Sequence, residues 1–275
     1  MKNINWRREL DLFFTAVMFL TRLPTPKWVQ FEEQYLTDCS RYFPLVGLLV
    51  GLVAAASYAI FSLLLGSLLA VILSMSLTVL ITGAFHEDGF ADSCDGFGGG
   101  WEKDQILRIM KDSRLGSYGA LGLLLILGTK LMALLTLAAQ EPLFNVFTSG
   151  QYSGNVVCAL VVAHPLSRLF CLLIIYNMDY VQESQKSKVA SQAQKLTDNA
   201  LWFAAASVAW LLLLLDVVTV LVLLGTLWVV YVGIKRYLLA KIGGYTGDCL
   251  GAAQQLAEVI IYILLCTSFS ALGLF

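Results

Sequence analysis

The chain has 275 residues, of which 58% are hydrophobic and 13% are charged, and its formal net charge at pH 7 is −1. Soluble domains carry about 25% charged residues, so this composition excludes an ordinary soluble globule as well as a disordered chain. The mean hydropathy of +0.76 predicts an all-α, polytopic protein whose residues 1–275 form one integral membrane domain in the lipid bilayer. The near-neutral charge gives no sign of nucleic-acid binding.

The N-terminal segment differs from the rest of the chain. It begins with the charged run Trp-Arg-Arg-Glu-Leu-Asp at residue 6, becomes apolar, and ends before Pro24 and Pro26. We expect a helix over Trp6–Leu20 that lies in the membrane interface, within a cytoplasmic segment of residues 1–42. A short eighth membrane span is the alternative.

Long apolar stretches predict seven membrane-spanning helices. They cover residues 43–65, 67–85, 118–139, 156–178, 200–215, 217–234 and 256–274, with tight turns expected at Gly66 and Asp216. Lys and Arg cluster at 2–41, 103–114, 186–195 and 235–241, whereas the loop 140–155 has none. The positive-inside rule therefore predicts a multi-pass protein of the inner (cytoplasmic) membrane, with its N-terminus inside and its C-terminus outside.

An acidic stretch directly follows the second predicted span. Asp88, Asp92 and Asp95 have the spacing i, i+4, i+7, which places three carboxylates on one face of a helix. Their mutual repulsion favours a bound cation, and hard carboxylate oxygens suit Mg²⁺, which also binds water and phosphate. We predict a metal site within a cytoplasmic acidic active-site loop over residues 86–117; a solvated acidic loop is the alternative.

His86 directly precedes these acids. It is either a general base or an interfacial histidine.

Cationic and hydroxyl side chains follow the acids at residues 111–114. Lys111 and Arg114 are suited to hold phosphate oxygens, with Ser113 as a further donor. Alternatively, both cations are only positive-inside anchors. Two further cations, Lys130 and Arg168, fall inside predicted spans and therefore require an acid, a polar partner or a phosphate.

A glycine-rich turn precedes the last span. Gly244 and Thr246 belong to a turn suited to cradle a phosphate, and Asp248 could complete or duplicate the metal site. Together these motifs indicate a membrane-bound, Mg²⁺-dependent transferase acting on an activated diphosphate. The residues alone do not separate phosphoryl-alcohol transfer from prenyl transfer, and a transporter with buried acids remains a weaker alternative.

Five motifs in order along the chain resemble the cobalamin synthase family, the bacterial adenosylcobinamide-GDP ribazoletransferases. They are Phe-Leu-Thr-Arg-Leu-Pro at 19–24, Phe-Pro-Leu-Val-Gly at 43–47, and the stretches 86–96, 109–116 and 243–252. The resemblance implies that adenosylcobinamide-GDP and α-ribazole, or its 5′-phosphate, give adenosylcobalamin, or its phosphate, and GMP. In a CDP-alcohol phosphotransferase we would expect Arg after Ala91, where this chain has Asp92.

The resemblance also implies roles for particular residues. It assigns Mg²⁺ binding to Asp88, Asp92 and Asp95, places Lys111–Arg114 in a second motif, and places Asp248 in a third. Glu87 stands where the family pattern has an apolar residue, and Gln255 where it has an acid. The oligomeric state is open, and both a homo-oligomer and a complex with other cobalamin-assembly enzymes are compatible with the sequence.

Overall fold

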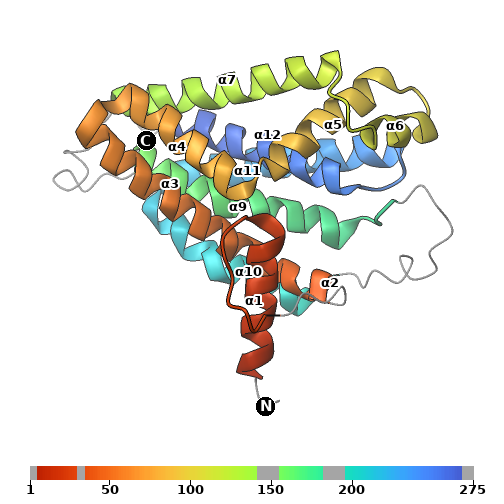
Figure 1. Ribbon diagram of the computed structural model, residues 1–275, viewed down its shortest axis with the longest axis horizontal. Helices are drawn as coiled ribbons and strands as arrows, with labels where there is room; N and C mark the ends of the chain where they lie inside the picture. The colour runs from red at the N-terminus through yellow and green to blue at the C-terminus, as the bar shows by residue number, and fades with distance from the viewer. Residues whose placement is uncertain (1–4, 30–34, 141–154, 182–195, 268–275) are drawn as a thin grey trace.

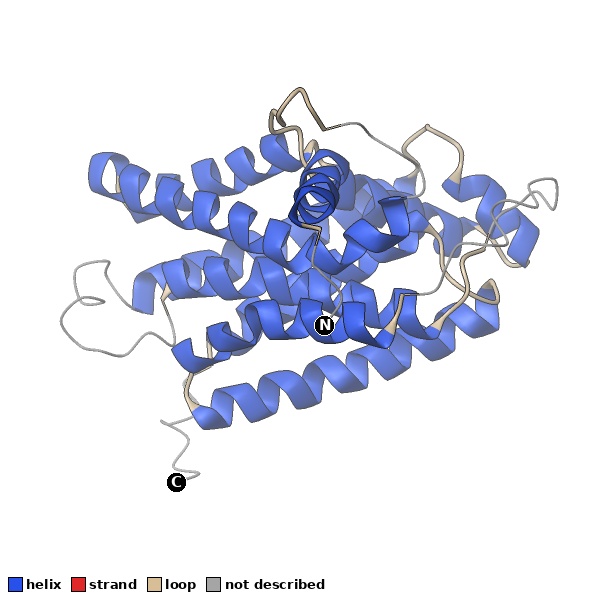
Figure 2. Ribbon diagram, turned by 90° about the horizontal axis from the view of Figure 1, so that it is seen from below, coloured by secondary structure: helices blue, strands red, loops and turns tan. Residues whose placement is uncertain are grey.

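The computed structural model describes residues 5–29, 35–140, 155–181 and 196–267 (Figure 1). Within these residues all regular structure is helical apart from one isolated bridge between Tyr180 and Tyr245 (Figure 2). The all-α prediction is therefore confirmed. The helices are α1 (Trp6–Leu20), α2 (Tyr35–Cys39), η1 (Ser40–Tyr42), α3 (Phe43–Leu65), α4 (Ser67–Thr82), α5 (Phe85–Gly99), α6 (Lys103–Met110), α7 (Ser117–Gln140), α9 (Val156–Asn177), α10 (Asp198–Ala209), η4 (Trp210–Leu214), α11 (Val217–Lys241) and α12 (Gly247–Leu265).

Five helical segments in the described part of the chain are long and apolar enough to span a membrane: Thr37–Leu65, which contains α3, and the helices α7, α9, α11 and α12. A sixth span is obtained if α4 and α5, which meet at an angle of 86°, count as one broken span. The segment predicted as a span at 200–215 forms α10 and η4, an apolar helix that is shorter than a full span. The predicted count of seven is therefore not confirmed.

Glycine and a capping acid make the predicted turns. Gly66 has φ +81° between α3 and α4, a conformation that favours glycine. Asp216 caps α11, and its Oδ1 accepts a hydrogen bond from the Thr219 amide at 2.9 Å. A third break lies between α4 and α5, close to the predicted end of the second span at residue 85, where Gly83 and Ala84 both have positive φ angles.

Helix α9 lies at the centre of the bundle, and 78% of its most apolar 18-residue stretch is buried inside the protein. Glycines on α3 allow the two helices to pack closely. A Cβ atom at Gly51 would lie 2.6 Å from the Leu160 carbonyl oxygen, and one at Gly47 would lie 2.6 Å from the His164 carbonyl oxygen. Close packing of α3 on α9 therefore depends on the absence of side chains at these positions.

The N-terminal helix α1 runs across the direction of the long helices (Figure 1). It buries Leu12, Ala16 and Leu20 against neighbouring helices, while Trp6 is 72% exposed. The guanidinium of Arg7 lies over the Trp28 ring at 4.1 Å from its centroid. At 15 residues, α1 is not among the helices long enough to span, which favours the interfacial position over an eighth span.

Candidate active site

The predicted site residues gather at one end of the bundle, where α5, α6 and the N-terminal ends of α7 and α12 meet (Figure 1). The first half of the predicted active-site segment 86–117 forms the helix α5 (Phe85–Gly99), as the i, i+4, i+7 spacing of its acids predicted. Small residues explain the packing of this polar helix. A Cβ atom at Gly89 would lie 3.0 Å from the Asp248 Cα, and one at Gly251 would lie 3.0 Å from the His86 carbonyl oxygen.

Three carboxylates form an open acidic face at this end. Asp88 of α5 is exposed, whereas Asp92 of α5 and Asp248 in the first turn of α12 are partly exposed. Asp88 and Asp92 lie one turn apart on α5, and between them Gly89 packs on the start of α12, where a Cβ atom at Gly89 would lie 3.0 Å from the Asp248 Cα. Acids from two motifs that are distant in the sequence therefore lie near one another, and their joint role at a metal stays a prediction. We call Asp88, Asp92 and Asp248 the acidic face.

The acidic face fits Mg²⁺ with few protein ligands. No three His, Cys, Asp or Glu side chains in the described ranges converge closely enough to hold one metal ion by themselves. Mg²⁺ is commonly bound by one or two carboxylates together with waters and substrate phosphates. Asp92 with Asp88 or Asp248 could provide such a partial shell, which a phosphate would complete.

Asp95 has a different environment from the other acids of α5. It is only 8% exposed. Its Oδ2 accepts a hydrogen bond from the Gly116 amide at 2.7 Å, and its Oδ1 accepts one from the Gly119 amide at 2.8 Å. The structure therefore turns Asp95 toward the start of α7, and its assignment to the metal stays a prediction.

His86 does not face the acidic face. At 3.6 residues per turn, it is rotated about 200° from Asp88 around α5. Its side chain is buried, and with Arg168 it lines a cavity of about 60 Å³ among Phe19, Phe43 and Phe85. This buried position argues against a general base at the acidic face, and His86 is a packed side chain rather than the interfacial histidine of the alternative.

The second motif is exposed beside the acids. The charge of Lys111 acts on Asp248, and Ser113 is exposed in the same loop. Arg114 is 87% exposed and pairs with Asp112, with Nε 3.0 Å from Oδ1 and Nη2 2.6 Å from Oδ2. These hydrogen bonds lower the pKa of Asp112 to about 2. Arg114 therefore already presents its planar fork to an anionic group.

The turn before Asp248 in the third motif makes structural contacts. The Tyr245 amide donates to the Asp179 carbonyl oxygen at 3.0 Å, and a Cβ atom at Gly244 would lie 2.3 Å from that same oxygen. Thr246 is buried and caps α12, where its Oγ1 accepts a hydrogen bond from the Cys249 amide at 3.2 Å. Gly244 and Thr246 therefore take part in backbone pairing and in a helix cap, and their predicted contact with a phosphate stays a prediction.

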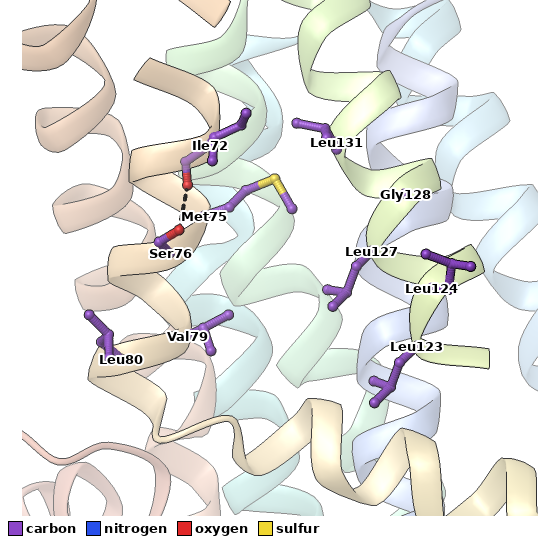
Figure 3. Close-up of a pocket in the computed structure, with 10 residues that line it drawn as sticks. All are labelled: Ile72, Met75, Ser76, Val79, Leu80, Leu123, Leu124, Leu127, Gly128 and Leu131. Carbon is purple, nitrogen blue, oxygen red and sulfur yellow. Dashed lines mark hydrogen bonds between the residues drawn. The ribbon is translucent and has the colours of Figure 1, made fainter. Parts of the chain in front are cut away.

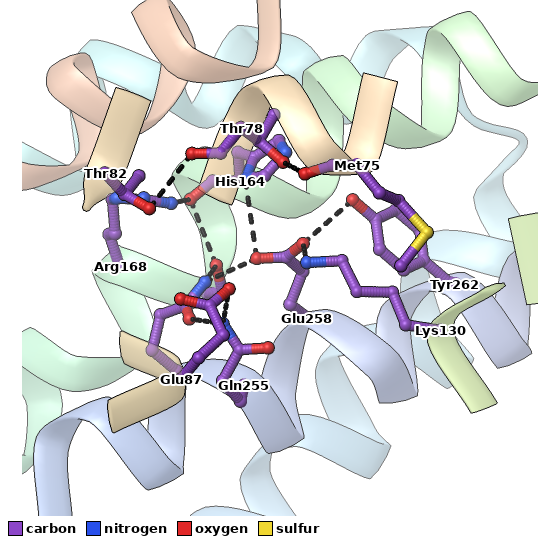
Figure 4. Close-up of polar contacts among 12 residues, drawn as sticks. Met75, Thr78, Thr82, Glu87, Lys130, His164, Arg168, Gln255, Glu258 and Tyr262 are labelled. Atoms are coloured by element: carbon purple, nitrogen blue, oxygen red, sulfur yellow. Dashed lines mark hydrogen bonds and ion pairs between the residues drawn. The ribbon is translucent and has the colours of Figure 1, made fainter. Parts of the chain in front are cut away.

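A buried polar network lies between α5, α7, α9 and α12 (Figure 4). At its centre is Glu258, which is 1% exposed. Its Oε1 lies 2.5 Å from the Lys130 Nζ and accepts a hydrogen bond from the Tyr262 hydroxyl at 3.0 Å. Its Oε2 accepts one from Gln254 Nε2 at 2.5 Å and lies 3.4 Å from His164 Nδ1. Lys130 therefore finds its partner on a neighbouring helix, as predicted.

The network reaches α5 through Gln255 of α12 and Glu87 of α5. Gln255 Nε2 donates to Glu87 Oε1 at 3.1 Å and to Gln254 Oε1 at 2.9 Å. Arg168 is 2% exposed and donates from Nη1 to the His164 carbonyl oxygen at 2.9 Å. Sequence reasoning missed most of this network, although Glu258 inside a predicted span was a signal for a buried pair.

An apolar groove of about 780 Å³ lies between α4 and α7 (Figure 3). Its lining is aliphatic, with Met75, Val79, Leu127 and Leu131 among its side chains. The hydroxyl of Ser76 donates to the Ile72 carbonyl oxygen at 2.8 Å. The groove therefore suits hydrocarbon and offers nothing to a phosphate.

Comparisons with known proteins agree with the motifs. A family model described as cobalamin-5-phosphate synthase matches residues 12–266. Proteins named adenosylcobinamide-GDP ribazoletransferase are 46% identical in Shewanella frigidimarina, over 95% of this chain and 96% of the relative, and 45% identical in Shewanella halifaxensis, over 94% and 96%. The protein of that name in Shewanella oneidensis is 43% identical over 95% of both chains. No solved structure matches the chain. The predicted resemblance is confirmed, and the chain belongs to the cobalamin-5-phosphate synthase family.

Proposed function

We propose that this chain joins adenosylcobinamide-GDP to α-ribazole, or to its 5′-phosphate, and releases GMP. The products are adenosylcobalamin, or its 5′-phosphate, and GMP. The observation that carries the proposal is the acidic face with Lys111 beside it at one end of the membrane bundle. Relatives of the chain are named for this transfer. A carboxylate cluster beside a cation is suited to a diphosphate.

The acids and the cations at this end of the bundle have different roles in the transfer. A ribazole hydroxyl attacks the phosphorus attached to cobinamide, a new phosphorus–oxygen bond forms, the diphosphate bond to GMP breaks, and the hydroxyl proton passes to solvent. Asp92 with Asp88 or Asp248 would hold Mg²⁺, which supplies charge neutralisation at the diphosphate when bound. Lys111 attracts the phosphate oxygens, and Arg114 exchanges Asp112 for a phosphate oxygen while retaining its bidentate geometry.

Release of GMP by the full chain in membranes tests this proposal. We expect release only when adenosylcobinamide-GDP, α-ribazole and Mg²⁺ are all present, and at least a 100-fold loss for Asp92→Asn, which keeps the side-chain volume but removes the charge. Asp104→Asn is the matched control, since Asp104 is an exposed acid on α6. Absence of GMP release by the wild-type chain would refute the transfer, and wild-type turnover by Asp92→Asn would exclude the acidic face.

We also propose that the acidic face points to the cytoplasm from the inner membrane. The support is the position of the basic residues. Lys103, Arg108 and Lys111 lie at the same end of the bundle as the acids, and α11 ends there with Lys241. The loop 140–155 lies almost entirely outside the described residues, and the cluster 186–195 lies wholly outside them.

Thiol labelling from outside intact spheroplasts tests this orientation. Ser67→Cys, at the opposite end of the bundle, should react with an impermeant reagent, whereas Trp101→Cys, between α5 and α6, should react only after lysis. Both positions are exposed in the structure. Labelling of Trp101→Cys in intact cells would reverse the assignment.

A further inference from the structure

The carboxylate of Asp95 joins two helices. Both of its oxygens accept backbone hydrogen bonds, from Gly116 at 2.7 Å and from Gly119 at 2.8 Å. These amides belong to the residue before α7 and to its first turn, where four N–H groups have no partner within the helix. A negative charge here is also favoured by the helix dipole. Asp95 of α5 therefore caps α7 from another helix.

Two glycines make room for this contact. A Cβ atom at Gly116 would lie 2.3 Å from Asp95 Oδ1, and one at Gly119 would lie 2.4 Å from Asp95 Oδ2. Any side chain at either position would displace the carboxylate. By contrast, a Cβ atom at Gly128, further along the same helix, would have no neighbour within 4 Å.

The loop that carries Lys111 and Arg114 contacts α5 at both of its ends. At its start, Met110 is 4% exposed and packs on Gly96, where a Cβ atom would lie 2.5 Å from the Met110 Cγ. At its end, Gly116 is held by Asp95. Consecutive residues of α5 thus fix both ends of the loop, one turn or so from Asp92 on the same helix.

We propose that Asp95 is a positioning residue that sets the distance between the cations of residues 111–116 and the acidic face. This role rests on the proposed function and differs from that of a metal ligand. Asp88 is exposed and Asp92 partly exposed, whereas Asp95 is buried beneath the backbone that it binds. Asp95 acts through Lys111 and Arg114 and does not itself touch the substrate.

The test combines Asp95→Asn, Gly116→Ala and the double variant, with Gly128→Ala as the matched control in α7. Asp95→Asn keeps one acceptor but loses the charge and the second acceptor, and Gly116→Ala displaces the carboxylate directly. Because small displacements of catalytic groups can cost about 100-fold in rate, we expect kcat to fall about 10- to 100-fold in each single variant. The KM for adenosylcobinamide-GDP should change much less. The double variant should be no slower than the slower single variant, because both changes break the same contact.

Two further measurements separate this role from its alternatives. Amide hydrogen exchange of the peptide 111–120 should accelerate at least tenfold in Asp95→Asn and stay unchanged in Gly128→Ala. The Mg²⁺ concentration for half-maximal turnover should stay within twofold of wild type. Unchanged exchange, unchanged kcat, additive rate losses or a tenfold rise in the Mg²⁺ requirement would each overturn the proposal. If the wild-type chain released no GMP, the proposed function would fail, while the exchange measurement would still decide whether Asp95 anchors the loop.

Discussion

Replacing Lys130 with Met tests how far the buried ion pair with Glu258 stabilises the bundle. The Lys130 side chain is 4% exposed and that of Glu258 is 1% exposed, and Nζ lies 2.5 Å from Oε1. Met has a similar length but no charge, so the carboxylate would remain in the interior without its cation. Removing one partner of a buried ion pair costs about 3–5 kcal/mol.

We expect a cost near the lower limit, because Glu258 keeps two neutral donors. The Tyr262 hydroxyl remains at 3.0 Å and the Gln254 amide at 2.5 Å. For chains of about this size, each kcal/mol lowers Tm by about 2–4 °C, so a loss of about 3 kcal/mol lowers Tm by about 6–12 °C. Tryptophan fluorescence during thermal unfolding of the purified full chain in detergent measures this shift.

A second variant separates the charge from the packing. Lys130→Met combined with Glu258→Gln removes both charges and should recover at least half of the lost Tm, because a neutral pair of similar volume is often as stable as a buried ion pair. Lys103→Met, at an exposed lysine of α6, is the control and should change Tm by less than about 2 °C. A Lys130→Met protein with the wild-type Tm, or a double variant less stable than the single one, would refute the reasoning.

Two further substitutions test the site and the packing. Arg114→Lys keeps the charge but loses the planar fork seen on Asp112. Loss of a charge-assisted hydrogen bond of about 1.5–3 kcal/mol should lower kcat about 10- to 100-fold, whereas wild-type turnover would mean that Arg114 only anchors the loop. Gly51→Ala places a methyl group 2.6 Å from the Leu160 carbonyl oxygen and should destabilise the chain by about 1–3 kcal/mol. Gly225→Ala, with no neighbour within 4 Å, should not; equal Tm values for the two variants would contradict the packing argument.

Local patterns predicted much of the fold. Hydropathy located the long spans, because twenty apolar residues in a row can satisfy their backbone in a membrane only as a helix. Gly66 and Asp216 were predicted as turns because a glycine and a capping acid interrupt apolar runs at those positions, and both interrupt helices in the structure. The i, i+4, i+7 spacing likewise predicted that Asp88 and Asp92 share a helix face.

Contacts between distant residues decided what sequence patterns could not. The acid spacing predicted a helix around Asp88 and Asp92, but packing against α12 and α7 is what keeps the glycine-rich stretch 86–99 helical. Similarly, three acids on one face looked equivalent, yet the start of α7 lies over Asp95 and not over Asp88. Gly244 was expected to approach a phosphate, and in the structure it approaches the Asp179 carbonyl oxygen. In each case the sequence identified the residue that matters, but it could not predict which distant residue that residue contacts.

The buried contact between Gln255 and Glu87 can be tested by exchanging the two side chains. Gln255 donates to Glu87 at 3.1 Å, with exposed fractions of 2% and 8%. Gln255→Glu would oppose two buried carboxylates and remove the donor to Gln254, so we expect a loss of about 3 kcal/mol. The exchange Glu87→Gln with Gln255→Glu restores one amide facing one carboxylate and should recover part of this loss, because Gln254 still lacks its donor. Thermal unfolding of the three proteins in detergent measures both steps. If the exchange variant were as unstable as Gln255→Glu alone, the contact between these two side chains would not account for the loss of stability.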